Sequence, residues 1–343
     1  MVVGYGLAGR AFHCPLIRRQ KGLWLEGIVA RDPKVRVEGA EAWGVRGMAS
    51  LEEALSDLSV GLVVIATPHD SHAELAVRAL EAGKDCVVDK VMALSVEQAD
   101  RMIAARDASG RMLSVFQNRR WDWDYLTLKR VLEEGGIGRP LLIESSVCRY
   151  AAPRSWRGDV RSAGTILHDW GAHLIDQALQ LGIGPCRRLS ASIIPATWAG
   201  VDSGGHGRVS LEFDEVQFQV ETSRICVLDR ARFWVVGSEG GLVKYGVDPQ
   251  EKALRAGRLD EAEESEQERT RIRRHSSVGE VVETCVEPIK GGWDEYYANI
   301  AEYLAGRAGL AVTAEQGKEV VCVLEAAERA ARDRVVVEGP WGG

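Results

Sequence analysis

The 343-residue sequence lacks the marks of several protein classes. Its seven cysteines are scattered and never spaced as C-x-x-C, which argues against a disulfide framework or a zinc site. No run approaches the roughly 18 apolar residues that a membrane span needs. The N-terminus has neither the basic region nor the apolar core of a signal peptide. We therefore expect a reduced, cytoplasmic protein that does not enter a membrane.

Positive charge is also scarce. The chain has 43 Lys and Arg residues against 50 Asp and Glu residues, which gives a net charge of −7. A nucleic-acid-binding protein usually carries a basic patch or stripe, so we expect no nucleic-acid partner and no binding to anionic membranes. The length and the 45% of hydrophobic residues predict two domains with sizeable cores.

The first 118 residues alternate strand and helix signals. The expected strands are 24–30, 60–66, 85–88 and 112–116, and the expected helices include 51–57, 70–82 and 95–108. Asp70 is expected to cap its helix, Gly83 to follow that helix in a left-handed conformation, and Ser95 to open a capping box. This alternation predicts an α/β domain, residues 1–118, with a doubly wound parallel sheet of the Rossmann type.

The pattern changes in residues 119–343, which we expect to form a second domain. The signals are a helix at 123–134, a strand at 141–149, strands alone from 189 to 247, and helices at 293–304 and 314–331. Consecutive strands without helices between them predict a mainly antiparallel sheet. The charged segment 258–283 is expected to be a solvated hairpin or loop.

Gly4-Tyr5-Gly6-Leu7-Ala8-Gly9 has the spacing G-x-G-x-x-G. In a dinucleotide-binding turn, the first glycine permits the tight turn, the second lets the backbone approach the pyrophosphate, and the third lets helix pack on strand. The motif opens the β-α-β pattern, so we expect Gly4, Gly6, Leu7, Ala8 and Gly9 to bind a cofactor. Because only three residues precede Gly4, either the first strand is short or the chain lacks a few native residues.

Other polar residues follow the expected strands at the edge where such sheets bind ligands. Arg31 follows the expected strand 24–30, at a place where an arginine favours binding of the 2′-phosphate of NADP. Asp32 is placed to cap the next turn. We therefore expect NADP in preference to NAD. Thr67 and Pro68 are expected beside the cofactor, and Lys90 is expected to donate to a substrate oxygen.

The segment His168–Gln177 has Asp169, His173 and Asp176 at helical spacing on one face. An aspartate can orient the histidine, whose ordinary pKa near 6.5 suits proton removal from an alcohol. Two other interpretations remain open. Asp169 can be a helix cap beside a buried histidine, or the three residues can bind a metal, although they lack clear further ligands.

These motifs give the chain a strong resemblance to the Gfo/Idh/MocA oxidoreductase family, in particular to its branch of NADP-dependent scyllo-inositol dehydrogenases. The resemblance is carried by the residues Gly4–Gly9 with Phe12–Leu16, Ala66–Pro68 with His72, Val115–Arg120, Gly164 with Asp169–Asp176, and Val236–Gln250. It implies a Rossmann domain followed by a domain with an open antiparallel sheet, whose free face commonly forms dimers or tetramers.

The resemblance also implies roles for single residues. Lys90 matches the lysine of the family's Glu-Lys-Pro motif, which contacts cofactor and substrate, while Asp169 and His173 match its catalytic pair. His72, Trp156 and Arg157 are implied near the cofactor, and Asn118 and Arg149 near the substrate. Val91 replaces the motif's proline, whose preceding bond is often cis. Since a cis bond before a non-proline residue costs about 2.5–4 kcal/mol, we expect Lys90–Val91 to be trans.

The expected function is hydride transfer between NAD(P) and a secondary hydroxyl of a cyclitol, sugar or related polyol. Lys90, Asp169 and His173 would be catalytic, and no metal is expected. Two alternatives stay open: a catalytically silent dinucleotide-binding sensor of the same fold, and an enzyme for a non-sugar substrate, since fold does not fix function.

Overall fold

The computed structural model describes residues Met1–Gly342 and divides them into two compact units. The first contains Met1–Asn118, Gln250–Ala262 and Gly292–Val321. The second contains Arg119–Pro249, Glu263–Gly291 and, among the described residues, 322–342. Each unit therefore combines segments that lie far apart in the sequence.

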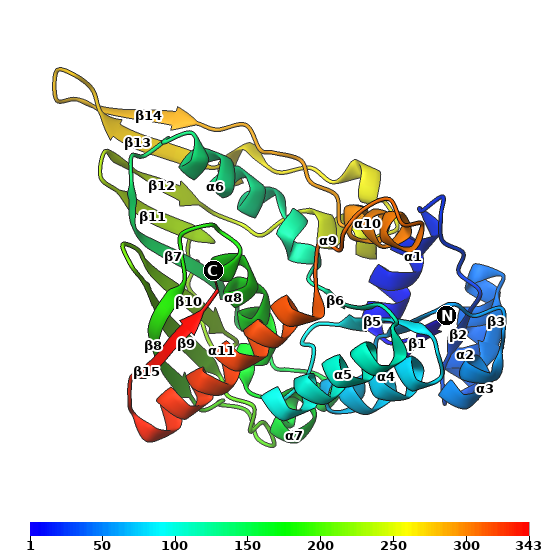
Figure 1. Cartoon of the computed structure of the whole chain (residues 1–343). Helices are drawn as coiled ribbons and strands as arrows, with labels where there is room; N and C mark the ends of the chain where they lie inside the picture. Colours follow the sequence, from blue (N-terminus) through cyan, green and yellow to red (C-terminus); the bar gives the residue numbers. More distant parts are fainter. Residues whose placement is uncertain (343) are drawn as a thin grey trace. The chain divides into compact units, whose positions relative to one another are not determined.

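The first unit is built on a six-stranded parallel sheet with the strand order β3-β2-β1-β4-β5-β6 (Figure 1). Its strands are β1 (Val2–Val3), β2 (Gly27–Val29), β3 (Arg46–Met48), β4 (Leu62–Ile65), β5 (Asp85–Asp89) and β6 (Leu113–Phe116). Strand order reverses direction between β1 and β4, and ligands of such sheets bind outside the strand ends at this point. The expected parallel doubly wound sheet is confirmed, and its first strand is short.

Helices flank this sheet. They are η1 (Gly9–His13, a π-helix), α1 (Cys14–Arg18), α2 (Pro33–Trp43), α3 (Leu51–Ser56), η2 (His69–Ser71), α4 (His72–Glu81), α5 (Val96–Ser109), α9 (Gln250–Arg255), η6 (Leu259–Glu261) and α10 (Asp294–Leu304). Although α10 is distant in sequence, Tyr296 on this helix is buried against the sheet. Its ring centroid lies 4.9 Å from that of Phe116, and its hydroxyl lies 2.8 Å from the Ser114 hydroxyl.

Local capping explains where several of these helices begin and end. The Ser95 hydroxyl accepts a hydrogen bond from the Gln98 amide, and Gly83 has a φ of 74° after α4, as expected. The expectation for Asp70 is wrong, because Asp70 lies inside η2 and Ser71 occupies the N-cap position of α4. The Ser71 hydroxyl bonds to Thr67 and Pro68, which closes this extra turn before the helix.

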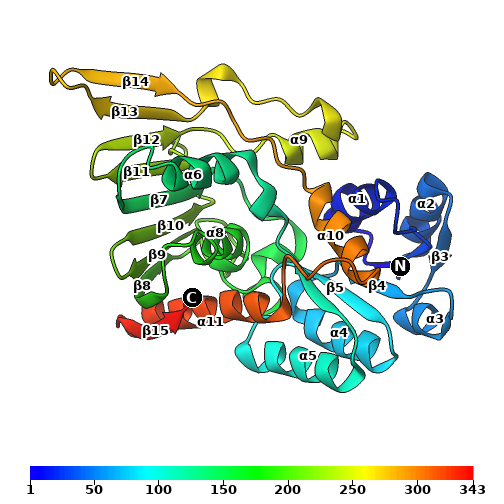
Figure 2. The ribbon, with the colours of Figure 1, turned by 45° about the horizontal axis from the view of Figure 1, so that its top comes forward.

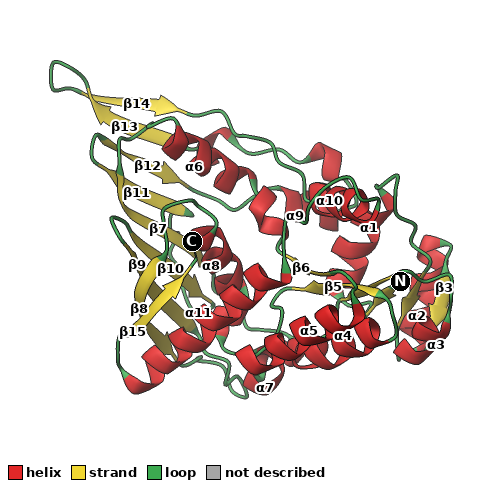
Figure 3. Cartoon of the chain, in the orientation of Figure 1, coloured by secondary structure: helices red, strands yellow, loops and turns green. Residues whose placement is uncertain are grey.

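The second unit is built on a nine-stranded, mainly antiparallel sheet with the order β14-β13-β12-β11-β7-β10-β9-β8-β15 (Figure 3). Its strands are β7 (Pro140–Cys148), β8 (Cys186–Ile194), β9 (His206–Phe213), β10 (Gln217–Ser223), β11 (Phe233–Gly237), β12 (Gly240–Lys244), β13 (Arg271–His275), β14 (Val281–Cys285) and β15 (Val337–Trp341). Only β7 and β10 pair in parallel. The expected antiparallel sheet is thus confirmed.

One face of this sheet carries helices, as Figure 2 shows for α6 and α8. The helical segments are η3 (Asn118–Trp121), α6 (Trp123–Glu133), η4 (Ser155–Gly158), α7 (Val160–Ala163), η5 (Ile166–His168), α8 (Trp170–Leu179), η7 (Glu266–Glu268) and the end of α11 (Ala314–Asp333). α8 packs against β10 and β7 and is buried from Gly171 to Leu179. No helix among residues 1–342 is long and apolar enough to cross a membrane.

Several sequence expectations differ from these elements. β2 is shorter than the expected strand 24–30, since Trp24 is 79% exposed and lies outside the sheet. The charged segment contains two short helical turns and then the hairpin β13–β14, which pairs with β12 and so extends the sheet. β3 and β15 were not expected, because neither has a run of apolar residues that marks a strand.

Candidate functional site

The glycine turn after β1 has the shape that a dinucleotide's pyrophosphate requires. A side chain at Gly4 would meet the Ala66 carbonyl oxygen at 2.5 Å, and one at Gly9 would clash with the carbonyl oxygen of Gly4. A side chain at Gly6, in contrast, would meet nothing within 4 Å. Leu7 and Ala8 begin the helix that follows. The turn therefore leaves open space beside a helix N-terminus, which fits a bound phosphate.

The two residues that follow Ala30 after β2 have different roles: Arg31 is an exposed cation and Asp32 is a helix cap. Asp32 caps α2, because its carboxylate accepts hydrogen bonds from the backbone amides of Lys34 and Val35. The capping interpretation of Asp32 is therefore confirmed. Arg31 is exposed, and its carbonyl oxygen accepts a hydrogen bond from the Arg36 guanidinium. The Arg31 side chain is thus accessible to a ligand at this strand end.

The His72 ring contacts backbone carbonyl groups that follow β4 and β5. Its Nδ1 lies 2.8 Å from the Val91 carbonyl oxygen and its Nε2 lies 3.0 Å from that of Thr67. Burial lowers the pKa of His72, which favours the neutral ring. The His72 ring is fully buried, so it supports Thr67, Pro68 and the residues after β5 from the interior of the unit. This position suits a supporting residue, whereas the resemblance implied a cofactor contact.

The peptide bond between Lys90 and Val91 is cis, so the expectation of a trans bond is wrong. That expectation considered only the intrinsic preference of the bond. In the folded chain the Val91 side chain is fully buried and its carbonyl oxygen is bonded to His72, so the surroundings determine the conformation. Lys90 itself is half-buried at the end of β5.

Asp89 connects Lys90 to a buried pair of aromatic residues. Its carboxylate accepts a hydrogen bond from the Lys90 backbone amide and lies 3.7 Å from His13 Nε2, while His13 Nδ1 lies 2.6 Å from the Tyr297 hydroxyl. Burial alone would raise the pKa of Asp89, but its interactions with His13 and Lys90 outweigh burial and hold that pKa at about 2. The carboxylate is therefore ionised beneath Lys90. The sequence analysis identified neither His13 nor Tyr297 as part of the site.

In the second unit, Asp169 and His173 lie at the start of α8. Asp169 occupies the N-cap position, but its side chain makes no capping hydrogen bond, so the capping interpretation fails. The His173 side chain is 6% exposed, and its ring centroid lies 6.1 Å from that of Trp170. Among residues 1–342, no group of three His, Cys, Asp or Glu side chains could hold a metal ion.

Buried ion pairs anchor α8 to its surroundings. Asp176, one turn after His173, receives two hydrogen bonds from Arg120 at 2.8 and 2.7 Å. The next residue, Gln177, accepts a hydrogen bond from the buried Arg232, which also pairs with Asp124. These contacts fix the rotation of the helix that carries His173.

Arginine side chains surround Asp169. Its Oδ2 atom lies 3.4 Å from Arg224 and 3.7 Å from Arg149. Burial lowers the pKa of Arg224, as do the nearby charges of Arg149 and Arg157, whereas Asp169 opposes the shift. Arg224 also donates to the Ser203 hydroxyl and the Arg157 carbonyl oxygen. Arg224 was not expected at the site, because only tertiary packing brings it close to Asp169 and Arg149.

The remaining expected residues lie in loops and turns. Asn118 is buried at the start of η3. Trp156 and Arg157 lie in η4, with the Arg157 guanidinium 4.5 Å from the centroid of the Trp156 ring. Trp156 and Arg157 thus belong with Arg149 and Asp169 in the second unit, whereas Gly4–Gly9, Arg31, Thr67, Pro68, His72 and Lys90 lie in the first.

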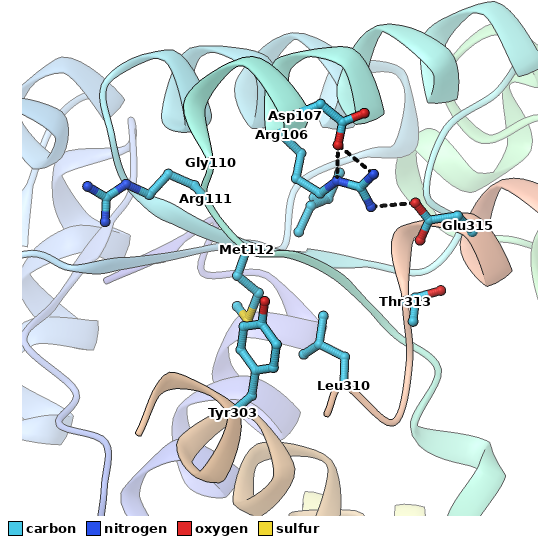
Figure 4. Close-up of a pocket in the computed structure, with 10 residues that line it drawn as sticks. Arg106, Asp107, Gly110, Arg111, Met112, Tyr303, Leu310, Thr313 and Glu315 are labelled. Carbon is cyan, nitrogen blue, oxygen red and sulfur yellow. Dashed lines mark hydrogen bonds and ion pairs between the residues drawn. The ribbon is translucent and has the colours of Figure 1, made fainter. Parts of the chain in front are cut away.

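A separate hollow of about 440 Å³ lies where β6 begins, which is the opposite end of the strand from Asn118 (Figure 4). Its walls include Tyr303, Leu310 and Thr313. Its Arg106 is paired with both Asp107 and Glu315, so the hollow offers no excess charge from this residue. It lies away from the edge at which parallel sheets bind nucleotides.

The chain is similar to known oxidoreductases along almost its whole length. Residues 1–117 match the family described as "Oxidoreductase family, NAD-binding Rossmann fold", and residues 125–243 match the "GFO/IDH/MocA C-terminal domain". The scyllo-inositol 2-dehydrogenase (NADP(+)) IolW of Bacillus subtilis is 31% identical over 97% of this chain and 93% of its own length.

Two further relatives support the same assignment. The uncharacterized oxidoreductase YdgJ of Escherichia coli is 34% identical over 98% of this chain and 97% of its own length. The solved structure of yvaA from Bacillus subtilis superposes with a TM-score of 0.90 at 28% identity, and covers 98% of this chain and 97% of its own. The chain therefore belongs to the Gfo/Idh/MocA family of NAD(P)-dependent oxidoreductases with an NAD-binding Rossmann domain.

Proposed function

We propose that the protein transfers hydride reversibly between NADP(H) and a secondary hydroxyl of a cyclitol, sugar or related polyol. Bound NADP would supply the acceptor for the hydride of the carbinol, so the chain's own residues must remove the hydroxyl proton and stabilise the oxygen. His173 would take the proton, Lys90 would donate to the oxygen, and Asp169 would orient His173 and contact a neighbouring hydroxyl.

The observation that carries the catalytic part is the anchoring of α8. A general base has to be held within hydrogen-bond reach of one hydroxyl, and this requires a fixed helix. The contacts Arg120–Asp176 and Arg232–Gln177 fix α8 in position one turn after His173. In the first unit, Asp89 and His13 give Lys90 a comparable support.

The cofactor and substrate parts rest on other observations. Exposed Arg31 at the end of β2 supports NADP over NAD, since a guanidinium binds a 2′-phosphate well. One relative, IolW, is described as a scyllo-inositol dehydrogenase that uses NADP(+). It favours a polyol as the substrate of this chain.

The proposal includes a cytoplasmic homodimer or homotetramer formed through the free face of the nine-stranded sheet. Trp234 and Tyr245 are 43% and 44% exposed and line a hollow together with Glu144, Asp229 and Arg230, so aromatic and charged side chains are available for an interface there. The seven cysteines are all free thiols, which suits a reducing compartment.

The test is a cofactor titration followed by a substrate screen. NADPH and NADH are titrated into the purified protein and binding is followed by nicotinamide fluorescence. A panel of cyclitols and sugars is then screened with NADP by absorbance. We expect NADPH to bind more tightly and at least one polyol to be oxidised. Binding without turnover of any polyol would favour the silent sensor.

A further inference from the structure

The surroundings of Asp169 contain more positive charge than this carboxylate can balance. Arg149 and Arg224 both contact its Oδ2 atom, and Arg157 lies close enough to affect Arg224 electrostatically. Two guanidinium groups thus contact one carboxylate at the N-terminus of α8, and a third lies near Arg224, while the helix dipole adds further positive potential.

Strand pairing explains why the two arginines lie close together. β7 and β10 are parallel neighbours, with Cys148 opposite Ser223. Beyond the strands the two segments stay paired through an antiparallel bridge between Tyr150 and Ile225, in which the Ala151 amide donates to the Arg224 carbonyl oxygen and the Cys226 amide donates to the Arg149 carbonyl oxygen. This pairing keeps Arg149 and Arg224 close together, and the guanidinium groups of both contact Asp169 at the start of α8.

Arg224 and Arg149 differ in their exposure and in how many hydrogen bonds they already make. The Arg224 side chain is 5% exposed and donates to Ser203, Asp169 and the Arg157 carbonyl oxygen. The Arg149 side chain is 51% exposed, and its contact with Asp169 is long at 3.7 Å. Arg149 is thus the guanidinium of this group that can turn to a bound ligand.

We propose that the substrate is a polyol that carries a carboxylate, such as a sugar acid, and that Arg149 binds this carboxylate while Arg224 holds Asp169. This inference rests on the proposed function and narrows its substrate class. A guanidinium matches a carboxylate in a planar, two-bond geometry, whereas a neutral polyol would leave the excess charge unbalanced.

The test measures equilibrium binding, which does not depend on turnover. Two matched pairs, gluconate with glucitol and glucuronate with glucose, are titrated into the protein–NADPH complex by calorimetry. Wild-type protein should bind the acid of each pair about 10- to 100-fold more tightly than the neutral compound. Arg149→Gln should remove this preference by weakening the binding of the acids about 10- to 100-fold.

Arg188 provides the control, since its side chain is 53% exposed and also pairs with a carboxylate, that of Glu212. Arg188→Gln should leave both affinities unchanged. Equal binding of acid and neutral compounds, or binding of neither, would overturn the proposal. So would an Arg149→Gln variant that loses NADPH affinity instead, because Arg149 would then contact the cofactor's phosphates. Oxidation of neutral polyols with no gain from the carboxylate would leave the proposed function standing without this inference.

Discussion

Asp176, on the proposed catalytic helix α8, forms a buried, two-bond ion pair with Arg120, and the exposed side-chain fractions of the two residues are 2% and 11%. Arg187 and Asp214 form a two-bond pair of similar geometry on the surface, with exposed fractions of 53% and 54%. The same chemistry thus occurs at two levels of burial in one protein.

Asp176→Asn should destabilise the protein by about 3–5 kcal/mol, because it leaves the Arg120 charge buried without its partner. Asp214→Asn should change the free energy of unfolding by about 1 kcal/mol or less. Urea unfolding of both variants gives the comparison. Equal losses would show that burial of the Arg120–Asp176 pair does not determine its importance.

Gly6→Ala should impair NADPH binding, whereas Gly9→Ala should impair the stability of the fold. A methyl group at position 9 would clash with the Gly4 carbonyl oxygen, so Gly9→Ala should lose about 1–3 kcal/mol of stability. A methyl group at position 6 meets only open space, so Gly6→Ala should fold normally but bind NADPH at least about 10-fold more weakly. Thermal unfolding and fluorescence titration distinguish the two. Wild-type NADPH affinity in Gly6→Ala would argue against a phosphate at this turn.

Arg31→Gln should weaken NADPH binding about 10- to 100-fold and leave NADH binding nearly unchanged, since only NADPH carries the 2′-phosphate. The matched control is Lys34→Gln, whose parent side chain is 83% exposed three residues further along. Dissociation constants for both cofactors check the prediction. A parallel loss for NADH would mean that Arg31 serves the adenosine ribose or the fold.

His173→Ala should lower kcat by about 10²- to 10⁴-fold, the usual contribution of a positioned base, while NADPH still binds. The exposed His275 on β13 serves as the control, and His275→Ala should keep full turnover. Steady-state kinetics with an oxidised polyol measure both. Unchanged turnover in His173→Ala would rule out this histidine as the base.

Asp89 should make the first unit sensitive to acid. Its pKa is about 2 in the folded chain and about 3.9 in an unfolded one, so the ionised group stabilises the fold by about 2 kcal/mol above pH 4. That stabilisation is lost as the pH falls through 2. Asp89→Asn should remove it at neutral pH and flatten the acid dependence measured by urea unfolding between pH 7 and pH 3. Asp107→Asn, at a 63% exposed side chain, should behave like the wild type.

The sequence predicts the features that depend on neighbouring residues. The Gly4–Gly9 turn, the Asp32 cap and the placement of Asp169 and His173 at one helix start follow from spacing alone. The convergence of Arg149 and Arg224 on Asp169 does not, because it depends on the pairing of two chain segments that lie 75 residues apart. The support of Lys90 by His13 and Tyr297 likewise comes from tertiary packing, and so does the cis bond before Val91.

The packing of α10 against the first sheet also bears on how the chain folds during synthesis. Ser114 and Tyr296, whose hydroxyls meet, are 182 residues apart. At about 5–20 residues per second, a ribosome needs roughly 10 to 40 s to deliver Tyr296 after Ser114. During that interval His13 can already pack on the Phe116 ring, but the contacts of that ring with Tyr296 and Tyr297 are still missing. The first sheet can therefore complete this part of its core only after residue 296 has left the ribosome.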